Sequence, residues 1–188
     1  MRFASQLSDL LLPDDPRRRA AEASVIAASK TKFCAFIASY CSARVASAAM
    51  RSVAFDLLAS LHKVPDALGN CRPRTATTKG RKLKVSGHFA NGTLDEVVAA
   101  YRPYKFALCF ENSQLTSYVT EKIISAALAR TVPIYWGAPD VAQLLNPKAF
   151  VHCDVDTSAV QWDVELKAAG GDKYALQDSV KARFGTAL

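Results

Sequence analysis

The most informative part of the chain is residues 105–122, which read KFALCFENSQLTSYVTEK. The largely apolar stretch Lys105–Phe110 is typical of a strand that is buried on both faces of a parallel sheet. A polar cluster, Glu111-Asn112-Ser113, ends this strand, and Ser117 is placed to cap a helix over about residues 118–130. The segment therefore predicts a strand, a polar loop and the start of a helix in succession.

The start of this helix is a candidate anion site, because a helix N-terminus presents unpaired N–H groups and the positive end of a dipole. Lys122 adds a full positive charge there, against the usual preference of cations for a helix C-terminus. Glu121 beside it offers a carboxylate that could accept two hydrogen bonds from a ribose diol. A residue placed against local preference indicates a functional constraint. A solvated Glu-Lys pair stays open as the alternative.

Strand and helix patterns alternate along the rest of the chain. We expect further strands at residues 33–38, 132–136 and 149–152, helices at 42–61 and 93–100, a short helix ending at 145, and a helical remainder broken at 170–171. This alternation predicts an α/β fold, a Rossmann-like parallel sheet with helices on both faces. Residues 1–30 are expected to form a poorly defined N-terminal segment, and residues 31–188 the domain. Such sheets bind ligands beyond the carboxyl ends of their strands, which points to the segments after Phe110 and Trp136.

The composition is that of one folded domain with an anionic partner. Of the 188 residues, 50% are hydrophobic and 22% are charged, which permits a buried core and argues against wholesale disorder. The net charge of +7 favours nucleic acid, a membrane surface or a nucleotide phosphate, without choosing among them. No apolar run approaches the roughly 18 residues that a membrane-spanning helix needs.

The five cysteines contain no Cys-x-x-Cys pair, so the sequence predicts no zinc site. Cys34, Cys109 and Cys153 lie in or beside apolar runs and are interpreted as small buried hydrophobic residues. Cys41 and Cys71 lie in polar stretches and could pair in an oxidising compartment, a question that the sequence leaves open.

Several motifs together resemble the signature of the α-1,3/4-fucosyltransferase family, glycosyltransferase family ten. They are Glu111-Asn112-Ser113 after the strand, Tyr118-Val119-Thr120-Glu121-Lys122 at the helix start, and Val132-Pro133-Ile134-Tyr135-Trp136-Gly137. The stretches 32–39 and 146–151 and the Arg51-containing helix match the same family. The resemblance covers about residues 31–155.

The resemblance implies the C-terminal domain of a two-domain enzyme of the GT-B type, the domain that binds GDP-fucose. By residue matching, Arg51 and Lys122 would contact the diphosphate as catalytic groups, Glu121 the ribose hydroxyls, and Asn112 and Tyr118 the donor pocket. Inverting transfer of fucose to an acceptor glycan builds negative charge on the leaving GDP, and two fixed cations stabilise that charge. GDP-fucose is then a donor substrate rather than a cofactor, and the two cations predict that no metal is required.

The family resemblance also implies a general base and a cellular location. The family's base is a carboxylate of the N-terminal domain, and none of Asp14, Asp15 and Asp56 lies in a matching motif. The chain is therefore expected to be a fragment that binds the donor and transfers poorly. Eukaryotic members lie on the lumenal side of the Golgi membrane, so the membrane would be reached only through an N-terminal anchor that this chain lacks. The sequon Asn91-Gly92-Thr93 agrees with a lumenal location.

Two alternatives remain. The chain could be a catalytically dead nucleotide-sugar-binding fragment. It could also be a basic nucleic-acid-binding module, because Lys79-Gly80-Arg81-Lys82-Leu83-Lys84, with Arg72 and Arg74 nearby, could contact phosphates. No recognition helix, aromatic sheet motif or zinc pattern accompanies this stretch, so a nucleic-acid partner is not expected.

Overall fold

The fold is a single parallel sheet, seen in a computed structural model that describes residues 16–39, 41, 48–78, 80 and 93–185. Its five strands are β1 (Lys32–Phe36), β2 (Asp66–Ala67), β3 (Tyr104–Phe110), β4 (Val132–Trp136) and β5 (Val151–His152). They lie in the order β2-β1-β3-β4-β5, and every neighbouring pair is parallel. The predicted α/β fold with a parallel sheet is confirmed.

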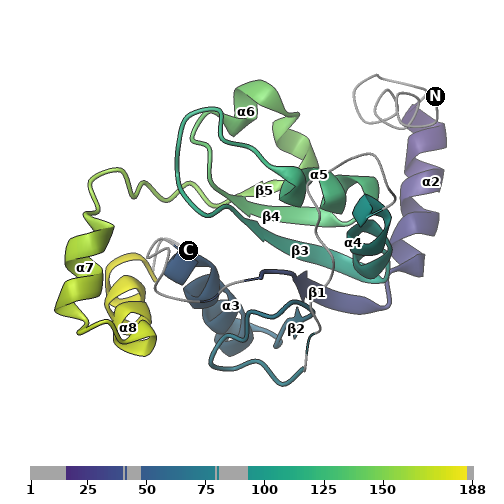
Figure 1. The fold of residues 1–188 in the computed structure, drawn as a ribbon. Helices are drawn as coiled ribbons and strands as arrows, with labels where there is room; N and C mark the ends of the chain where they lie inside the picture. Colours follow the sequence, from purple (N-terminus) through teal and green to yellow (C-terminus); the bar gives the residue numbers. More distant parts are fainter. Residues whose placement is uncertain (1–15, 40, 42–47, 79, 81–92, 186–188) are drawn as a thin grey trace.

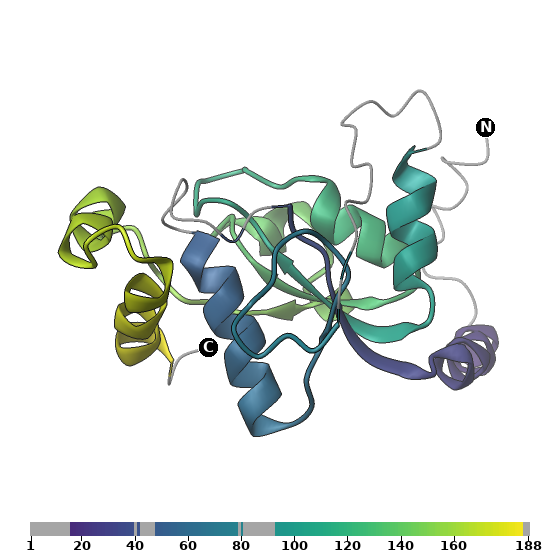
Figure 2. The ribbon, with the colours of Figure 1, turned by 60° about the horizontal axis from the view of Figure 1, so that its bottom comes forward.

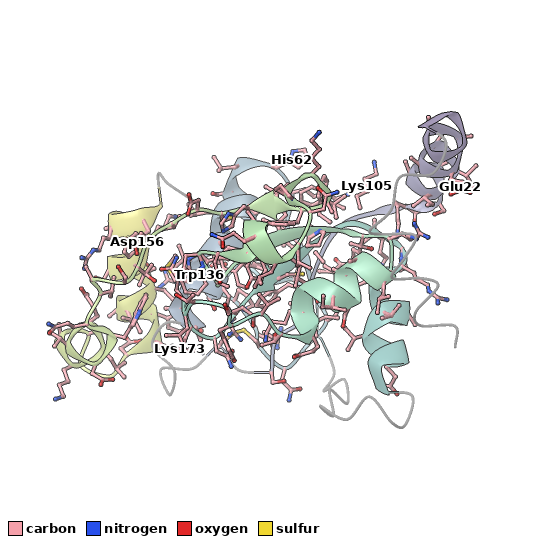
Figure 3. The ribbon with its side chains drawn as sticks, turned by 90° about the horizontal axis from the view of Figure 1, so that it is seen from above. Glu22, His62, Lys105, Trp136, Asp156 and Lys173 are labelled. Carbon is pink, nitrogen blue, oxygen red and sulfur yellow. A yellow bond between two sulfur atoms is a disulfide. The ribbon has the colours of Figure 1, made fainter. Side chains whose placement is uncertain are left out.

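Both faces of the sheet are buried, and successive residues of the central strands point alternately into the two hydrophobic cores. Phe36 and Leu108 pack into one core, and Ala107 and Cys109 into the other. Trp136, at the end of β4, has no exposed surface and lies among densely packed side chains in Figure 3. This double burial explains why β1, β3 and β4 read as apolar runs rather than as alternating ones.

Helices cover the two faces, as the sequence predicted (Figures 1 and 2). One face carries α3 (Ala49–Leu61), with α7 (Trp162–Ala168) and α8 (Lys173–Phe184) beyond it; the other carries α4 (Thr93–Tyr101), α5 (Glu121–Leu128) and α6 (Val141–Leu144). Leu176, Val180 and Phe184 of α8 join the core around α3. The C-terminal helices therefore brace α3, which contributes one wall of the site described below.

Strand bounds differ from the sequence prediction where tertiary contacts intervene. β1 ends at Phe36 rather than Ala38, because the carbonyl of Ala38 accepts the N–H of Cys71 at 2.8 Å outside the sheet ladder. Gly69 permits this approach, since an added Cβ there would lie 2.4 Å from the same carbonyl oxygen. β5 begins only at Val151, because Pro147–Ala149 form a 3₁₀ turn. The two-residue edge strand β2 was not expected.

The helix α2 (Pro16–Ser29) precedes the sheet and is followed by a buried lysine. The ammonium of Lys30 donates to the carbonyls of Arg102 (2.7 Å) and Ala129 (2.8 Å) and to the hydroxyl of Thr131 (3.2 Å). Burial lowers the pKa of Lys30, while the three acceptors satisfy its donors. Lys30 thus connects the start of β1 to the segments that lead into β3 and β4.

The cysteines divide as the sequence indicated. Cys41 and Cys71 form a disulfide with a Cα–Cα distance of 4.8 Å, which answers the question left open above. Cys34 and Cys109 are buried and free, and burial raises the pKa of the Cys34 thiol to about 12. Cys153 is free and partly buried. The three free thiols behave as small hydrophobic groups.

Reducing the Cys41–Cys71 disulfide should destabilise the domain. The bond joins residues 30 apart in sequence, and the chain-entropy model gives about 3–4 kcal/mol for a loop of that size. We expect the free energy of unfolding, measured by urea denaturation, to fall by about this amount when reductant is added. The double variant Cys41→Ser/Cys71→Ser is the control and should not respond to reductant. Equal stability of the wild-type protein with and without reductant would refute this contribution.

Candidate functional site

The strand order creates a crevice between the carboxyl ends of β1 and β3. From β1 the chain passes to β2 on one side and returns to β3 on the other, so the segments leaving β1 and β3 diverge. Ligands of doubly wound sheets bind at such a switch point. A cavity of about 160 Å³ lies here, lined by Ile37, Ala38, Ser39, Arg51, Val97, Tyr101, Asn112, Glu121, Lys122 and Ser125.

Arg51 reaches this cavity from the first turn of α3 and is only 3% exposed. Its Nη2 donates to the backbone carbonyl of Glu111 at 3.1 Å and to Oδ1 of Asn112. Burial lowers the pKa of the Arg51 guanidinium, but the negative charge of Glu111 opposes this effect, and arginine stays protonated in proteins. The buried Nε has no hydrogen-bond partner among the described residues. Arg51 therefore holds a fixed positive charge at the cavity, and its buried Nε is left without a partner in the part of the chain that the structure describes.

Lys122 reaches the same cavity from the first turn of α5. Its ammonium donates to Oε2 of Glu111 and to the hydroxyl of Thr120, both at 2.8 Å. Oε1 of Glu121 lies 3.8 Å from it. The position of Lys122 at a helix N-terminus, which the helix dipole disfavours, is thus explained, because the buried carboxylate of Glu111 compensates its charge. Two cations from separate helices meet at one cavity, as the sequence predicted.

Four of the five predicted donor-site residues line the cavity, namely Arg51, Asn112, Glu121 and Lys122. Tyr118 is not among the lining residues. Its backbone carbonyl accepts the hydroxyl of Tyr135 at 3.4 Å, and its own hydroxyl lies close enough to Arg51 to affect the arginine pKa. Tyr118 therefore stands beside the site rather than in its wall.

The predicted cap at Ser117 is wrong. Helix α5 begins at Glu121, with Thr120 in the N-cap position. Ser117 instead adopts a left-handed backbone conformation (φ 59°), and its N–H and hydroxyl both donate to the Asp140 carboxylate at 2.7 Å. These two bonds hold the pKa of Asp140 below its usual range. They tie the loop after β3 to the loop after β4, a contact that local sequence does not encode.

Glu111 is the residue that the sequence interpretation missed, having been taken only as part of a polar loop. Its N–H donates to the carbonyl of Trp136 at 2.8 Å, so the β3–β4 ladder continues through it, and its side chain has no exposed surface. The burial of Glu111 could have been predicted from its position, because an acidic residue directly after a strand buried on both faces still lies in the core layer. Such a carboxylate needs buried partners.

The other polar candidates take structural roles or lie outside the described residues. Oδ1 of Asp56 accepts the N–H (3.0 Å) and hydroxyl (2.6 Å) of Thr75, which orders a loop. Arg74 pairs with Asp178 at 3.0 Å. Asp14, Asp15, the sequon at 91–93 and most of the basic stretch 79–84 cannot be placed as site residues, because their side chains lie outside the described part of the chain.

The described residues hold neither a cluster of metal ligands nor a helix that could span a membrane. No group of three or more His, Cys, Asp or Glu side chains there could hold a metal ion. Among the same residues, no helix combines the length and the apolar character needed to cross a membrane.

A second, larger cavity of about 720 Å³ lies at the opposite end of the sheet, between α2 and the starts of β3 and β4. Its walls are largely apolar, and its lining includes the cations Lys105, Arg130 and Lys148; Figure 3 shows Lys105 at the surface. None of the predicted donor-site residues lines it. We assign the site to the smaller cavity because it lies at the switch point and is lined by two cations, the buried Arg51 and the partly buried Lys122.

Comparison with known families agrees with this placement. The model of the glycosyltransferase family 10 (fucosyltransferase) C-terminal domain matches residues 27–174. The chain belongs to glycosyltransferase family 10. The predicted family is confirmed, and the match includes every residue that lines the small cavity.

Relatives within family 10 come from distant organisms. The Helicobacter pylori alpha-(1,3)-fucosyltransferase FucT is 39% identical over 123 residues, which is 65% of this chain and 21% of that protein. The Arabidopsis thaliana alpha-(1,4)-fucosyltransferase is 33% identical over 84 residues, 45% of this chain and 21% of that protein. The chain thus spans about a fifth of these relatives' length.

Solved family 10 structures share the fold over most of the chain. An alpha1,3-fucosyltransferase crystallised with GDP-fucose is 30% identical with a TM-score of 0.53, over 92% of this chain and 46% of that one. A second structure, with GDP, is 32% identical with a TM-score of 0.51, over 79% of this chain and 38% of that one. The fold and the family are therefore shown together.

The two cations should act as one anion-binding pair. We expect Arg51→Ala and Lys122→Ala each to weaken the binding of inorganic pyrophosphate by about 1.5–3 kcal/mol, roughly 10- to 150-fold, the range of a charge-assisted hydrogen bond. Isothermal titration calorimetry measures this directly. Arg74→Ala is the matched control, because it removes an exposed, paired cation and should change binding by less than about 0.5 kcal/mol. If both Arg51→Ala and Lys122→Ala bound pyrophosphate as tightly as wild type, the assignment of these two residues to an anion site would be wrong.

Proposed function

We propose that this chain is the donor-binding part of a fucosyltransferase that transfers fucose from GDP-fucose to a hydroxyl of an acceptor glycan, with inversion. One observation carries the proposal: Arg51 and Lys122 converge from α3 and α5 on the cavity at the switch point. Support comes from the related crystal structures, one with GDP and one with GDP-fucose.

We propose a place in the cavity for each part of the donor. The cavity, at about 160 Å³, is smaller than the roughly 300–1,000 Å³ of typical ligand pockets, so it suits part of a nucleotide sugar. The diphosphate would lie against Arg51 and Lys122, which both line the cavity. Glu121, half-buried at the start of α5, would accept the ribose hydroxyls. Asn112 would complete the donor pocket from the end of β3.

Transfer develops negative charge on the leaving GDP as the acceptor hydroxyl attacks from the opposite face of the sugar. Two cations that are already held in place stabilise this charge without reorganising, which lowers the barrier. We propose for this reason that no metal ion is required. Arg51, Lys122 and the first N–H groups of α5 would together face the group whose charge increases.

The base that activates the acceptor is proposed to come from another part of the enzyme. Glu111 is engaged by Lys122 and Thr120, and Glu121 is assigned to the ribose, so neither is free to take the acceptor proton. The chain spans 46% of the related structure with GDP-fucose, which leaves room for such a group in a full-length enzyme. This chain alone should therefore bind donor better than it transfers fucose.

We also propose an oxidising, lumenal compartment for the enzyme, with the membrane reached only through an N-terminal anchor. The Cys41–Cys71 disulfide supports this proposal, because such bonds persist in secretory compartments and are rare in the cytosol. Fractionation of the full-length product tests it, and recovery in the cytosol would refute it.

GDP and GDP-fucose should stabilise the chain against heat. A ligand present at 100 times its Kd contributes about 2.7 kcal/mol, which for a chain of this size raises the melting temperature by roughly 5–10 °C. A single-stranded oligonucleotide of equal phosphate concentration is the control and should leave the melting temperature unchanged. Stabilisation by the oligonucleotide but not by GDP would favour the nucleic-acid alternative.

Glu121→Gln should separate ribose recognition from phosphate binding. The amide keeps one acceptor oxygen but loses the charge, so GDP affinity should fall by about 0.5–1.5 kcal/mol, less than for Lys122→Ala. Pyrophosphate, which has no ribose, should bind the variant no more weakly than it binds wild type. Calorimetric titration of both ligands gives the comparison. An equal loss for GDP and pyrophosphate would contradict the ribose assignment.

A further inference from the structure

The carboxylate of Glu111 is completely buried, and all of its recorded bonds go to two residues at the start of α5. Oε1 accepts the N–H and the hydroxyl of Thr120, both at 2.9 Å. Oε2 accepts the ammonium of Lys122 and the hydroxyl of Thr120, both at 2.8 Å. A carboxylate without solvent is costly unless it is paired and hydrogen-bonded. These contacts make it an ordered acceptor behind Lys122, which lines the cavity.

The surroundings of Glu111 hold it in this position. Its N–H donates to the carbonyl of Trp136, and Gly137 packs so closely that an added Cβ would lie 2.5 Å from Cγ of Glu111 and 2.6 Å from the hydroxyl of Tyr135. The backbone of Glu111 is thus held in the sheet ladder, and its side chain packs against the chain just after β4, which restricts the room for other side-chain conformations.

Thr120 gives a second, independent sign that this arrangement serves the lysine. It occupies the N-cap position of α5, where a threonine hydroxyl usually accepts a backbone N–H of the first turn. Here the side chain makes no such bond. The hydroxyl instead lies between Glu111 and Lys122 and contacts both. The normal capping interaction is absent, and the group is used to fix the ammonium.

Glu111 also connects Lys122 to the second cation. Its backbone carbonyl accepts Nη2 of Arg51 at 3.1 Å, while its side chain accepts Nζ of Lys122 at 2.8 Å. One residue thus sets the positions of both positive groups, which come from different helices.

We propose that Glu111 is a positioning residue, one that fixes the Lys122 ammonium, with the help of the Thr120 hydroxyl, where it can bind the diphosphate of the donor. The inference rests on the proposed function and adds a residue to it. Without Glu111, the long side chain of Lys122 would be free to pair with Glu121, whose carboxylate is already 3.8 Å away. That pairing would occupy both the phosphate-binding lysine and the ribose-binding carboxylate.

Two physical effects predict opposite results when the charge of Glu111 is removed. If the Glu111 carboxylate affects binding only through its own negative charge, it repels the diphosphate. Glu111→Gln then removes this repulsion, and GDP binds more tightly. If it positions Lys122, the same change weakens binding, and the loss disappears once Lys122 is absent. A double-mutant cycle separates these cases.

The experiment is calorimetric titration of GDP into wild type, Glu111→Gln, Lys122→Ala and the double variant. We expect Glu111→Gln to raise Kd about 5- to 20-fold in the wild-type background and less than about 2-fold in the Lys122→Ala background, as coupled neighbours do. Tighter binding by Glu111→Gln, or an equal loss in both backgrounds, would overturn the inference. Failure of the wild-type protein to bind GDP would instead refute the proposed function, and this inference with it.

A second variant keeps the test decisive if Glu111→Gln does not fold. Thr120→Val preserves shape, the N–H bond to Glu111 and the helix start, because the hydroxyl caps nothing. It should raise Kd for GDP about 3- to 10-fold, again only when Lys122 is present. Glu165→Gln is the matched control, since Glu165 pairs with Arg183 at 3.0 Å on the C-terminal helices and should leave Kd unchanged. Unaltered GDP binding by Thr120→Val would contradict the inference.

Discussion

The site depends on one constraint, the need to compensate a carboxylate that has no access to solvent. Glu111 directly follows the central strand β3 and is still buried in the core layer, so groups from neighbouring elements must compensate its charge. The start of α5 meets it with Thr120 and Lys122, and α3 contributes Arg51 to the backbone carbonyl. Glu111 is thus the residue at which α3, the start of α5 and their two cations meet.

The sheet order decides where that point lies. Because β2 and β3 flank β1 on opposite sides, the segments leaving β1 and β3 diverge, and the crevice between them opens beside Glu111. The disulfide at Cys71 and the close approach of Gly69 to Ala38 hold the wall on the β1 side. The Ser117–Asp140 contact holds the loop after β3. The order of the strands forms the crevice, so the binding site needs only a few polar and charged side chains to line it.

The sequence predicted the elements better than it predicted their connections. Apolar runs buried on both faces were recognisable as parallel strands. Four residues that the family resemblance singled out, Arg51, Asn112, Glu121 and Lys122, line one cavity. Ser117 was misassigned because its partner, Asp140, lies 23 residues away. Lys30 and Glu111 were overlooked for the same reason, as their acceptors and donors come from other elements. Local pattern encodes burial, whereas long-range pairing of polar groups becomes visible only in the fold.

The most direct test of this account is a crystal structure of the chain with GDP. The account predicts the diphosphate in the cavity between β1 and β3, within hydrogen-bonding distance of the Arg51 guanidinium and the Lys122 ammonium, with the Glu111 carboxylate still holding Lys122. A nucleotide bound instead in the larger cavity beside Lys105 and Arg130, or a diphosphate at the crevice that contacts neither cation, would contradict it.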